Sequence, residues 1–326
     1  MKIIYTGTHF PEEIQRRLVD FMKEKGYALD LLKLKTRNAS DNKEDLLGYD
    51  VIICSGEAYG KDTIEYLSDS LKLLSRHGIG TDEIDKETAT KLGIAVCNAA
   101  GSLSTSVAEC ALSLILNVLH EYPALDRSLR AGGWGAHNFA PELRGKTVGL
   151  VGFGGIAQKL AAYLAPFECR ILAYDPYFNE TAANTLGVRK ATINEICDQS
   201  DIISLHLPLT DETRHLVNMD FIGKMKKTAV LINTSRGPIV DEATLIEALR
   251  ERKIAGAGLD VFEKEPISQD NPLLALDNTV LLPHIASHTV ESQLGAGLMA
   301  CRNAVAFIEG KKPESLLNPD YMRYVK

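Results

Sequence analysis

The sequence has no long apolar run, and this absence limits the class of protein. None of its hydrophobic stretches approaches the length of about 18 residues that a membrane helix needs. The first ten residues, MKIIYTGTHF, also lack the long apolar core of a secretory signal peptide, and their pattern favours a first β-strand instead. We therefore expect no membrane partner.

Charge of one sign is also scarce, because 36 basic and 43 acidic residues are mixed along the chain and the formal net charge is −7. A nucleic-acid partner needs a concentrated basic surface, so this balance predicts none. The six cysteines stand apart, without a CxxC motif or a cysteine–histidine cluster. Scattered thiols of this kind are typical of a reducing compartment, and we expect a cytoplasmic protein.

Two kinds of catalytic centre are missing from the pattern. The sequence contains no G-x-S-x-G segment, which argues against a serine hydrolase. His284 and His288 are four residues apart, but no HExxH motif surrounds them. We therefore expect no metal site.

What is present is an alternation of short β-branched runs with amphipathic helical stretches, in two series. This alternation predicts an α/β fold with doubly wound parallel sheets. At about 100–200 residues per domain, 326 residues suggest two domains. In the first series we expect strands at 2–7, 27–31, 50–54, 71–75 and 94–97 and a helix at 11–25. In the second we expect strands at 147–151, 170–174, 201–205, 228–232, 256–260 and 279–282 and helices at 155–166 and 241–251.

The domain boundaries follow from the segments that join no series. A long apolar helix is expected at 105–120, between the two series. The last apolar helical stretch, 289–309, has no further series to join, so we expect it to cross back and make the first domain discontinuous. Residues 121–143 are expected to be irregular and hold the only tryptophan, Trp134. A subunit contact and a surface loop pinned to its own core both remain open for this segment.

A glycine fingerprint opens the second series. The segment TVGLVGFGGIA (147–157) follows a predicted strand, begins a helix and carries Gly152, Gly154 and Ala157 at G-x-G-x-x-A spacing. The first glycine allows a tight turn, the second lets a pyrophosphate approach the backbone, and the alanine allows close packing of helix on strand. Since a helix N-terminus attracts phosphate, we expect Gly155 and Ile156 to contact the dinucleotide as well.

Asp175 ends the strand that follows the fingerprint, in ILAYDPYF. A carboxylate at this position accepts hydrogen bonds from both hydroxyls of the adenosine ribose and repels a 2′-phosphate. The sequence therefore predicts NAD rather than NADP as the cofactor.

Three segments each place one polar side chain just after a strand of the second sheet: LINTSRG with Arg236, LDVFEKEP with Glu265 and LLPHIASHT with His284. Ligands bind at the carboxyl ends of parallel strands, so the three can converge on the nicotinamide. Histidine suits proton transfer near neutrality, which makes His284 the predicted acid–base group. Glu265 would orient its ring, and the planar fork of Arg236 would bind carboxylate and carbonyl oxygens of a substrate.

With these residues placed, the chain resembles the D-isomer-specific 2-hydroxyacid dehydrogenase family over essentially its whole length, and most closely the 3-phosphoglycerate dehydrogenase branch. The matching motifs are SRHGIGTDEID (75–85), SVAE (106–109), GLVGFGGIA (149–157), HLPLTDETRHLVN (206–218), INTSRGPIVDEATLIEAL (232–249), LDVFEKEP (259–266) and PHIASHT (283–289).

The resemblance implies an NAD-dependent oxidoreductase that interconverts a small D-2-hydroxy acid and its 2-oxo acid by hydride transfer, with 3-phosphoglycerate or a related acid as substrate. It implies two Rossmann-like domains with parallel sheets. Residues 1–100 plus 288–326 would form a flavodoxin-like substrate domain, and residues 101–287 the NAD-binding domain. A homodimer through the NAD-binding domain, with a dimerisation arm at 120–143, is also implied.

The resemblance assigns further residues. It implies a cradle of backbone N–H groups at Gly78 and Ile79 for the substrate carboxylate, beside Arg76 and His77, which could supply charge. It gives Arg236, Glu265 and His284 the catalytic roles stated above. At the cofactor, in addition to the fingerprint and Asp175, it implies contacts by Ile79, Leu207, Thr234, Ser235, Asp260 and Ser287.

The chain departs from the family in two places. NAAGSLSTSVAE lacks the proline common at position 100 and the asparagine common at position 103, which affects the hinge and a cofactor contact. Cys54 and Ser55 follow the third strand, where many phosphoglycerate enzymes have a phosphate-binding arginine, and this weakens 3-phosphoglycerate as the substrate.

Two other functions remain open. The first alternative is a non-enzymatic NAD-sensing interaction protein, like the corepressors that share this fold and retain a similar triad. The second is oxidation of phosphite, which the triad does not exclude. Formate oxidation is disfavoured because formate enzymes pair the histidine with glutamine, whereas this chain has Glu265.

Overall fold

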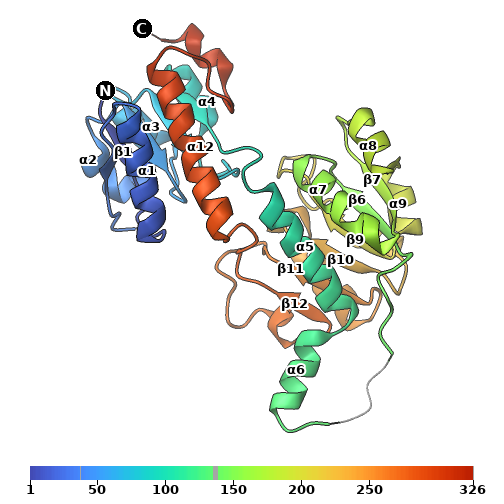
Figure 1. Ribbon diagram of the computed structural model, residues 1–326. Helices are drawn as coiled ribbons and strands as arrows, with labels where there is room; N and C mark the ends of the chain where they lie inside the picture. Colours follow the sequence, from blue (N-terminus) through green and yellow to red (C-terminus); the bar gives the residue numbers. More distant parts are fainter. Residues whose placement is uncertain (37, 135–138, 326) are drawn as a thin grey trace. The chain divides into compact units, whose positions relative to one another are not determined.

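The computed structural model describes residues 1–36, 38–134 and 139–325, which form two compact α/β units (Figure 1). Unit 1 consists of residues 1–103 and 288–326, and unit 2 of residues 104–287. Among the described residues, every helix is too short or too polar to span a bilayer.

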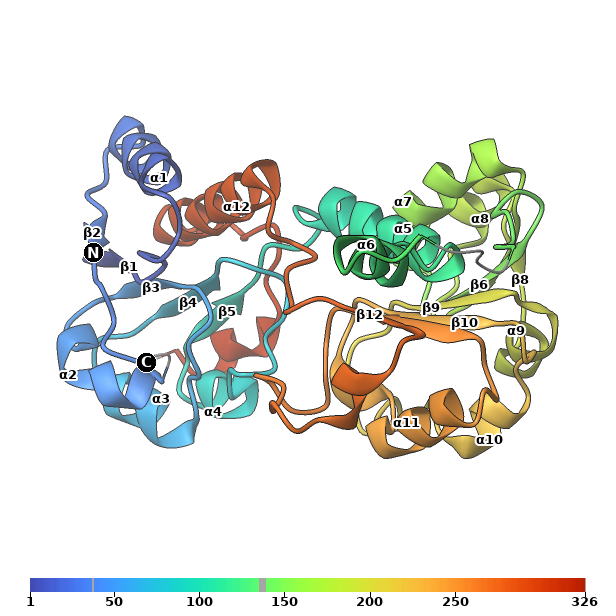
Figure 2. The same ribbon diagram turned by 90° about the horizontal axis from the view of Figure 1, so that it is seen from below.

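Unit 1 is built on a five-stranded parallel sheet in the order β2-β1-β3-β4-β5. Its strands are β1 Ile3–Tyr5, β2 Asp30–Leu31, β3 Val51–Cys54, β4 Leu73–Arg76 and β5 Ala95–Cys97. Its helices are α1 Glu12–Glu24, α2 Lys43–Leu46, α3 Lys61–Leu67, α4 Lys86–Lys91 and α12 Val290–Ile308. Helices α1 and α12 cover one face and α2, α3 and α4 the other (Figure 2). Both faces are therefore buried, which explains why β3 is apolar throughout.

Helix α12 joins unit 1 although it follows unit 2 in the chain. Its Ala300, Cys301 and Ala304 are buried in one cluster with Ile14 and Leu18 of α1. Helices α1 and α12 together supply the helical cover of this face in the described part of the unit, so α12 completes the core.

Unit 2 is built on a seven-stranded parallel sheet in the order β12-β11-β10-β9-β6-β7-β8. Its strands are β6 Thr147–Val151, β7 Arg170–Tyr174, β8 Arg189–Lys190, β9 Ile202–Leu205, β10 Val230–Asn233, β11 Gly256–Leu259 and β12 Thr279–Leu281. Its helices are α5 Ser104–Leu119, α6 Tyr122–Arg130, α7 Gly155–Leu164, α8 Glu180–Leu186, α9 Ile193–Gln199, α10 Met219–Gly223 and α11 Glu242–Arg250. Helices α5, α7 and α8 cover one face of the sheet, and α9, α10 and α11 the other (Figure 2).

Both sheets reverse their strand order beside their first strand. In unit 1, β1 lies between β2 and β3, and in unit 2, β6 lies between β7 and β9. Every strand pair is parallel, so all carboxyl ends of one sheet lie on one edge. Ligands bind at this edge in open α/β sheets. The predicted fold class, two doubly wound parallel sheets, is confirmed.

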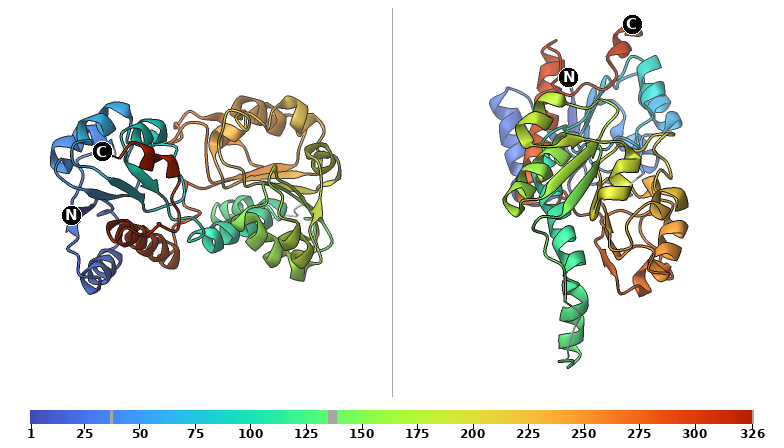
Figure 3. Two further views of the ribbon diagram at one scale, coloured as in Figure 1. Left: turned by 90° about the horizontal axis from the view of Figure 1, so that it is seen from above. Right: turned by 90° about the vertical axis from the view of Figure 1, so that its right-hand side faces the viewer.

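The expectation of an irregular segment over 121–143 is wrong for its first third, where helix α6 forms. Pro123 lies in the first turn of this helix, where proline is favoured. The glycines that follow the helix are typical of a loop and led to the wrong prediction. Trp134 is 92% exposed, so it does not pin the segment to its own core. Helix α6 has no buried residue and extends beyond the rest of unit 2 (Figure 3, right). Residues 135–138 of the expected arm lie outside the described residues.

Candidate active site

Glu265 and His284 are in direct contact at the carboxyl edge of the sheet of unit 2. Glu265 lies in the loop after β11, and His284 follows β12. The Nδ1 atom of His284 lies 2.6 Å from Oε2 of Glu265, whose Oε1 accepts the N–H of Phe262 at 3.0 Å. Burial raises the pKa of Glu265, but the His284 hydrogen bond, the Phe262 N–H and the charge of Arg236 outweigh it, so the pKa is lowered. Glu265 is therefore an ionised acceptor that holds a proton on Nδ1.

The backbone of His284 is held in a left-handed conformation with φ of 55°. Asp260, which follows β11, supplies the restraint: its carbonyl accepts the N–H of His284 at 2.8 Å. Its two carboxylate oxygens accept the N–H groups of Ile285 and Ala286 at 2.8 and 2.9 Å. Left-handed backbone is disfavoured for a bulky residue, so it persists only where neighbours impose it. Asp260 thus fixes the turn that presents the imidazole.

The Asp260 carboxyl group is fully buried, and burial is the main reason that its pKa is raised. The two N–H donors oppose this effect, since they stabilise the charged form. The family resemblance implied a cofactor contact for Asp260 but not that it organises the His284 turn.

Arg236 is placed by a tight turn after β10. Its carbonyl accepts the amide of Asn233 at 2.9 Å, and its Nη1 donates to the carbonyl of Ser235 at 2.7 Å. The Asn233 side-chain oxygen also accepts the N–H of Ser235 at 3.0 Å and its hydroxyl at 2.8 Å. A buried asparagine therefore shapes the turn that carries the arginine, a role that sequence reasoning missed.

Gly237 brings the Arg236 turn against the loop of Glu265. A Cβ atom built on Gly237 would lie 1.8 Å from the carbonyl oxygen of Phe262 and 1.9 Å from its carbon. No side chain fits there, so the two backbones touch only because this residue is glycine. The three predicted catalytic residues thus come from the neighbouring strands β10, β11 and β12. Glu265 and His284 are hydrogen-bonded, and Arg236 acts on Glu265 through its charge.

The glycine turn after β6 has the shape that a dinucleotide needs. Gly152 has φ of 99°, and a Cβ there would lie 2.7 Å from the carbonyl carbon of His206. A Cβ on Gly154 would meet nothing within 4 Å, so this position faces open space. Gly155 begins α7, with Ile156 next in its first turn. The first glycine is therefore required by packing, and the second leaves room for a phosphate at the helix N-terminus.

Asp175 follows β7 and anchors the same turn. Its Oδ2 accepts the N–H of Phe153 at 2.7 Å, and its Oδ1 accepts the N–H of Tyr177 at 2.7 Å. A carboxylate has about four acceptor positions, so capacity remains for ribose hydroxyls. Phe153 is buried and stacks on Phe178 with ring centroids 5.2 Å apart.

Further polar atoms line the edge of this sheet. In the described part of the chain, the hydroxyl of Thr234 and Nε2 of His206 are buried without a hydrogen-bond partner. Burial lowers the pKa of His206 to about 4, so its ring is neutral near neutrality. Buried polar groups left unpaired in this way are commonly completed by a ligand or water. Leu207 is buried beside His206, and Ser287 is half-buried.

The predicted carboxylate cradle lies in unit 1, after β4. The carbonyls of Gly78 and Ile79 accept hydrogen bonds from the N–H of Ala99 and the amide of Asn98, both at 2.8 Å. Within the residues that the structure describes, neither N–H group of the pair donates a hydrogen bond. Arg76 donates from Nε to the carbonyl of Gly80 at 3.1 Å and so supports the loop.

His77 does not carry charge, contrary to what the sequence suggested. It is 4% exposed, its Nδ1 lies 2.9 Å from the hydroxyl of Tyr5, and the ring of Phe10 stacks on it. Burial lowers its pKa to about 3, so the ring is neutral near neutrality. Of the two residues that could supply charge beside the cradle, Arg76 remains the candidate.

No group of three or more potential metal ligands occurs among the described residues. The edge of unit 2 offers a carboxylate–imidazole pair next to a guanidinium.

Known proteins resemble this chain in sequence and in structure. The family model for the NAD-binding domain of D-isomer specific 2-hydroxyacid dehydrogenases matches residues 112–286. The chain is 41% identical over 270 residues to D-3-phosphoglycerate dehydrogenase of Methanocaldococcus jannaschii, covering 82% of this chain and 51% of that protein. It is 42% identical over 260 residues to glyoxylate reductase of Thermofilum pendens, covering 78% of this chain and 77% of that protein.

Solved structures give the same result. A glyoxylate reductase from Paecilomyes thermophila matches with a TM-score of 0.86 and 27% identity, covering 97% of this chain and 98% of that one. D-lactate dehydrogenase of Aquifex aeolicus, complexed with NAD and lactic acid, matches with a TM-score of 0.84 and 27% identity, covering 97% and 99%. The chain spans about half the length of the phosphoglycerate dehydrogenases that it matches.

Proposed function

Because this chain belongs to the D-isomer specific 2-hydroxyacid dehydrogenases, we propose that it is an NAD-dependent oxidoreductase that interconverts a small D-2-hydroxy acid and its 2-oxo acid. One observation carries the proposal: the imidazole of His284, on a left-handed turn, lies 2.6 Å from an ionised Glu265. This pair is suited to moving a proton at a carbonyl oxygen.

Three residues of the chain have separate roles in the proposed reaction. When bound, NADH supplies the hydride for reduction of the 2-oxo acid. His284 would donate the proton that the new hydroxyl oxygen needs, from Nε2, because Nδ1 is engaged with Glu265. Glu265 would fix the ring and stabilise the imidazolium form. The guanidinium of Arg236 would bind the carbonyl and carboxylate oxygens of the substrate.

Residues of both units are proposed to bind ligand. In unit 1, the N–H groups of Gly78 and Ile79 would bind the substrate carboxylate, with Arg76 and His77 beside them, and Ile79 would also border the cofactor. In unit 2, the glycine turn would hold the pyrophosphate, as the open space above Gly154 allows. The remaining residues proposed at the cofactor are Gly152, Gly155, Ile156, Asp175, Leu207, Thr234, Ser235, Asp260 and Ser287.

Asp175 supports NAD over NADP, since its carboxylate would repel a 2′-phosphate. The test compares catalytic efficiency with NADH and NADPH for the wild type and for Asp175→Ser. We expect a strong NADH preference that falls in the variant. Equal efficiency with both cofactors in the wild type would refute the role of Asp175.

The substrate is proposed to be a 2-oxo acid without a phosphate group. The relatives include phosphoglycerate dehydrogenases and glyoxylate reductases, but Ser55 follows β3 where an arginine would favour a phosphate. The test measures NADH oxidation with glyoxylate, pyruvate, hydroxypyruvate, 2-oxoglutarate, phenylpyruvate and 3-phosphohydroxypyruvate, with chiral chromatography of the product.

We expect turnover with a small unphosphorylated acid, a D product, and loss of turnover in His284→Ala with NADH affinity retained. Tight NADH binding without turnover of any acid would favour the NAD-sensing alternative.

The assembly and the compartment are proposals of the same kind. The exposed helix α6 with Trp134 and Phe139 supports a homodimer through unit 2, with 120–143 as the arm. Sedimentation of the chain and of Trp134→Ser tests this, because a monomeric wild type would refute it. All six cysteines are free thiols, which supports a cytoplasmic location.

A further inference from the structure

A second histidine–glutamate pair involves the loop that carries Glu265. Nε2 of His215 lies 2.7 Å from Oε1 of Glu263, and both side chains are partly exposed. His215 has a left-handed backbone with φ of 52°. Glu263 stands two residues before Glu265, so it belongs to the loop that positions the proposed catalytic carboxylate.

Glu263 is also tied to the start of helix α11. Its Oε2 accepts the N–H of Glu242 at 3.3 Å, and its own N–H donates to Oε2 of Glu242 at 3.0 Å. The other oxygen of Glu242 accepts the amide of Asn271 at 2.7 Å. The loop is therefore fixed on α11 by a reciprocal pair of hydrogen bonds.

His215 is itself attached to the turn that carries Arg236. Its N–H donates to the carbonyl of Pro238 at 2.9 Å. Two residues further along, Val217 forms a parallel β-bridge with Val240, which follows the Arg236 turn. Gly237, in the same segment, touches the backbone of Phe262. His215 thus connects the Arg236 turn to the Glu265 loop through its backbone on one side and its ring on the other.

The ring of His215 donates a hydrogen bond into a group of acidic residues. The carboxylates of Glu263 and Glu242 each accept the N–H of the other residue, and Asp241 and His215 interact electrostatically. Each carboxylate is thus held by a backbone N–H, and a carboxylate has the capacity to accept a further hydrogen bond. Within the described residues, the His215 ring is the donor found on Glu263 from outside its own loop and α11.

We propose that His215 is a positioning residue, which holds the turn of Arg236 and the loop of Glu265 in register through Glu263. The inference rests on the proposed dehydrogenase function, because its main effect is on catalysis. Loss of the ring removes that donor from Glu263, so the loop loses its side-chain link to the Arg236 turn and the Glu265–His284 contact loosens. A displacement of about 1 Å in such a group costs up to about a hundredfold in rate. An indirect effect should be smaller, about tenfold.

The test uses His215→Ala, His215→Gln and Glu263→Gln, alone and combined. We expect His215→Ala to lower kcat about tenfold with the dissociation constant of NADH unchanged. His215→Gln keeps a donor for Glu263 and should recover most of the rate. The double variant His215→Ala with Glu263→Gln should lose less than the sum of the single losses, because both substitutions act on one contact.

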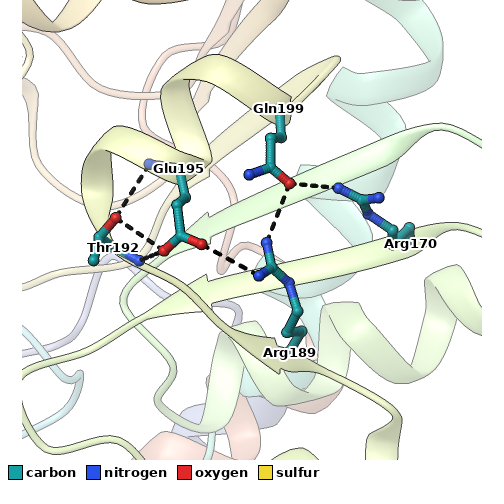
Figure 4. A network of polar contacts seen from close by, with 5 residues as sticks. All are labelled: Arg170, Arg189, Thr192, Glu195 and Gln199. Atoms are coloured by element: carbon teal, nitrogen blue, oxygen red, sulfur yellow. Dashed lines mark hydrogen bonds and ion pairs between the residues drawn. The ribbon is translucent and has the colours of Figure 1, made fainter.

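A matched control comes from a surface pair in the same unit. Arg189 of β8 lies 3.2 Å from Glu195 of α9, with exposure similar to that of the His215–Glu263 pair. Figure 4 shows this network, in which Arg170 and Arg189 both donate to Gln199. Strand β8 and helix α9 carry no proposed site residue, so Arg189→Gln should leave kcat unchanged.

A second readout separates the inference from the proposed function. The proton on Nδ1 of His284 should give a downfield NMR signal while it is held by Glu265. We expect this signal to weaken in His215→Ala and to persist in Arg189→Gln, whether or not a substrate has been found. A persistent signal together with unchanged kcat in His215→Ala overturns the inference, even if melting temperature falls. Failure of the wild type to turn over any acid, with a weakened signal in His215→Ala, overturns the proposed function alone.

Discussion

Replacing Gly237 by alanine tests whether the arrangement of the catalytic side chains depends on one backbone contact. The new Cβ would lie 1.8 Å from the carbonyl oxygen of Phe262, whereas such contacts are not shorter than 3.0 Å in real proteins. The two segments must therefore separate by at least 3.0 − 1.8 = 1.2 Å. Since the Arg236 turn lies on one side and the Glu265 loop on the other, the shift acts directly on the proposed site.

The magnitude follows from this displacement. A misplacement of about 1 Å costs about a hundredfold in rate, which corresponds to about 2.7 kcal/mol of transition-state stabilisation. Overpacking of a well-filled site costs about 1–3 kcal/mol of folding free energy, so the variant should fold with a lowered melting temperature. We expect kcat/KM to fall about a hundredfold while NADH still binds.

The assay measures NADH oxidation with the preferred 2-oxo acid, alongside NADH binding and thermal unfolding. Gly223→Ala is the matched control, because Gly223 lies in helix α10 and a Cβ there meets nothing within 4 Å. This control should keep its activity and its stability. A Gly237→Ala protein with wild-type kcat/KM would refute the claim that this contact aligns Arg236 with Glu265.

Three further predictions concern the same edge of the sheet. Arg236→Lys should raise the KM for the 2-oxo acid about tenfold or more, because the bidentate fork is lost; steady-state kinetics with an unchanged KM would contradict this. Asp260→Asn should cost about 1–3 kcal/mol of stability, since an amide N–H would face a backbone N–H at Ile285 or Ala286; denaturant unfolding measures the loss, and an unchanged midpoint would argue against the restraint. The lowered pKa of Glu265 means that its ionised form favours the folded state. This contribution is present above its unfolded pKa of about 4.3 and is lost as pH falls through the lower folded pKa. The difference in melting temperature between the wild type and Glu265→Gln should therefore shrink below about pH 4.3, and a difference that grows toward acid would reverse the sign.

The sequence was sufficient to predict the fold class and the strands that carry the proposed catalytic residues. Arg236, Glu265 and His284 each follow a β-branched run, and parallel strands bring their carboxyl ends to one edge. Short-range pattern was enough here because the direction of each strand determines where its end lies.

The contacts that hold these residues in place could not be predicted from the sequence pattern. Gly237 meets Phe262, and Asp260 caps the turn of His284, at sequence separations of about 25 residues. No periodicity records which backbone atoms come together across strands. The neutral state of His77 was missed for the same reason, since it depends on burial by Tyr5 and Phe10.

Helix α6 was missed because local signals conflicted. Its nine residues include Pro123 and are followed by Gly132 and Gly133, and none of them is buried in its own unit. The proline near its start and the glycines after its end favoured a loop, although the nine residues are amphipathic.

The divided sequence of unit 1 has a consequence for synthesis on the ribosome. Residues 104–287 emerge between the five strands of unit 1 and the helix α12 that completes its core. At about 5–20 residues per second, this interval lasts about 10–40 s. During that time one face of the nascent sheet is covered by α1 alone, and at its end the inserted unit has all of its strands while α12 has yet to emerge. We therefore expect the inserted unit to fold first, and the N-terminal strands to depend on chaperones until α12 arrives.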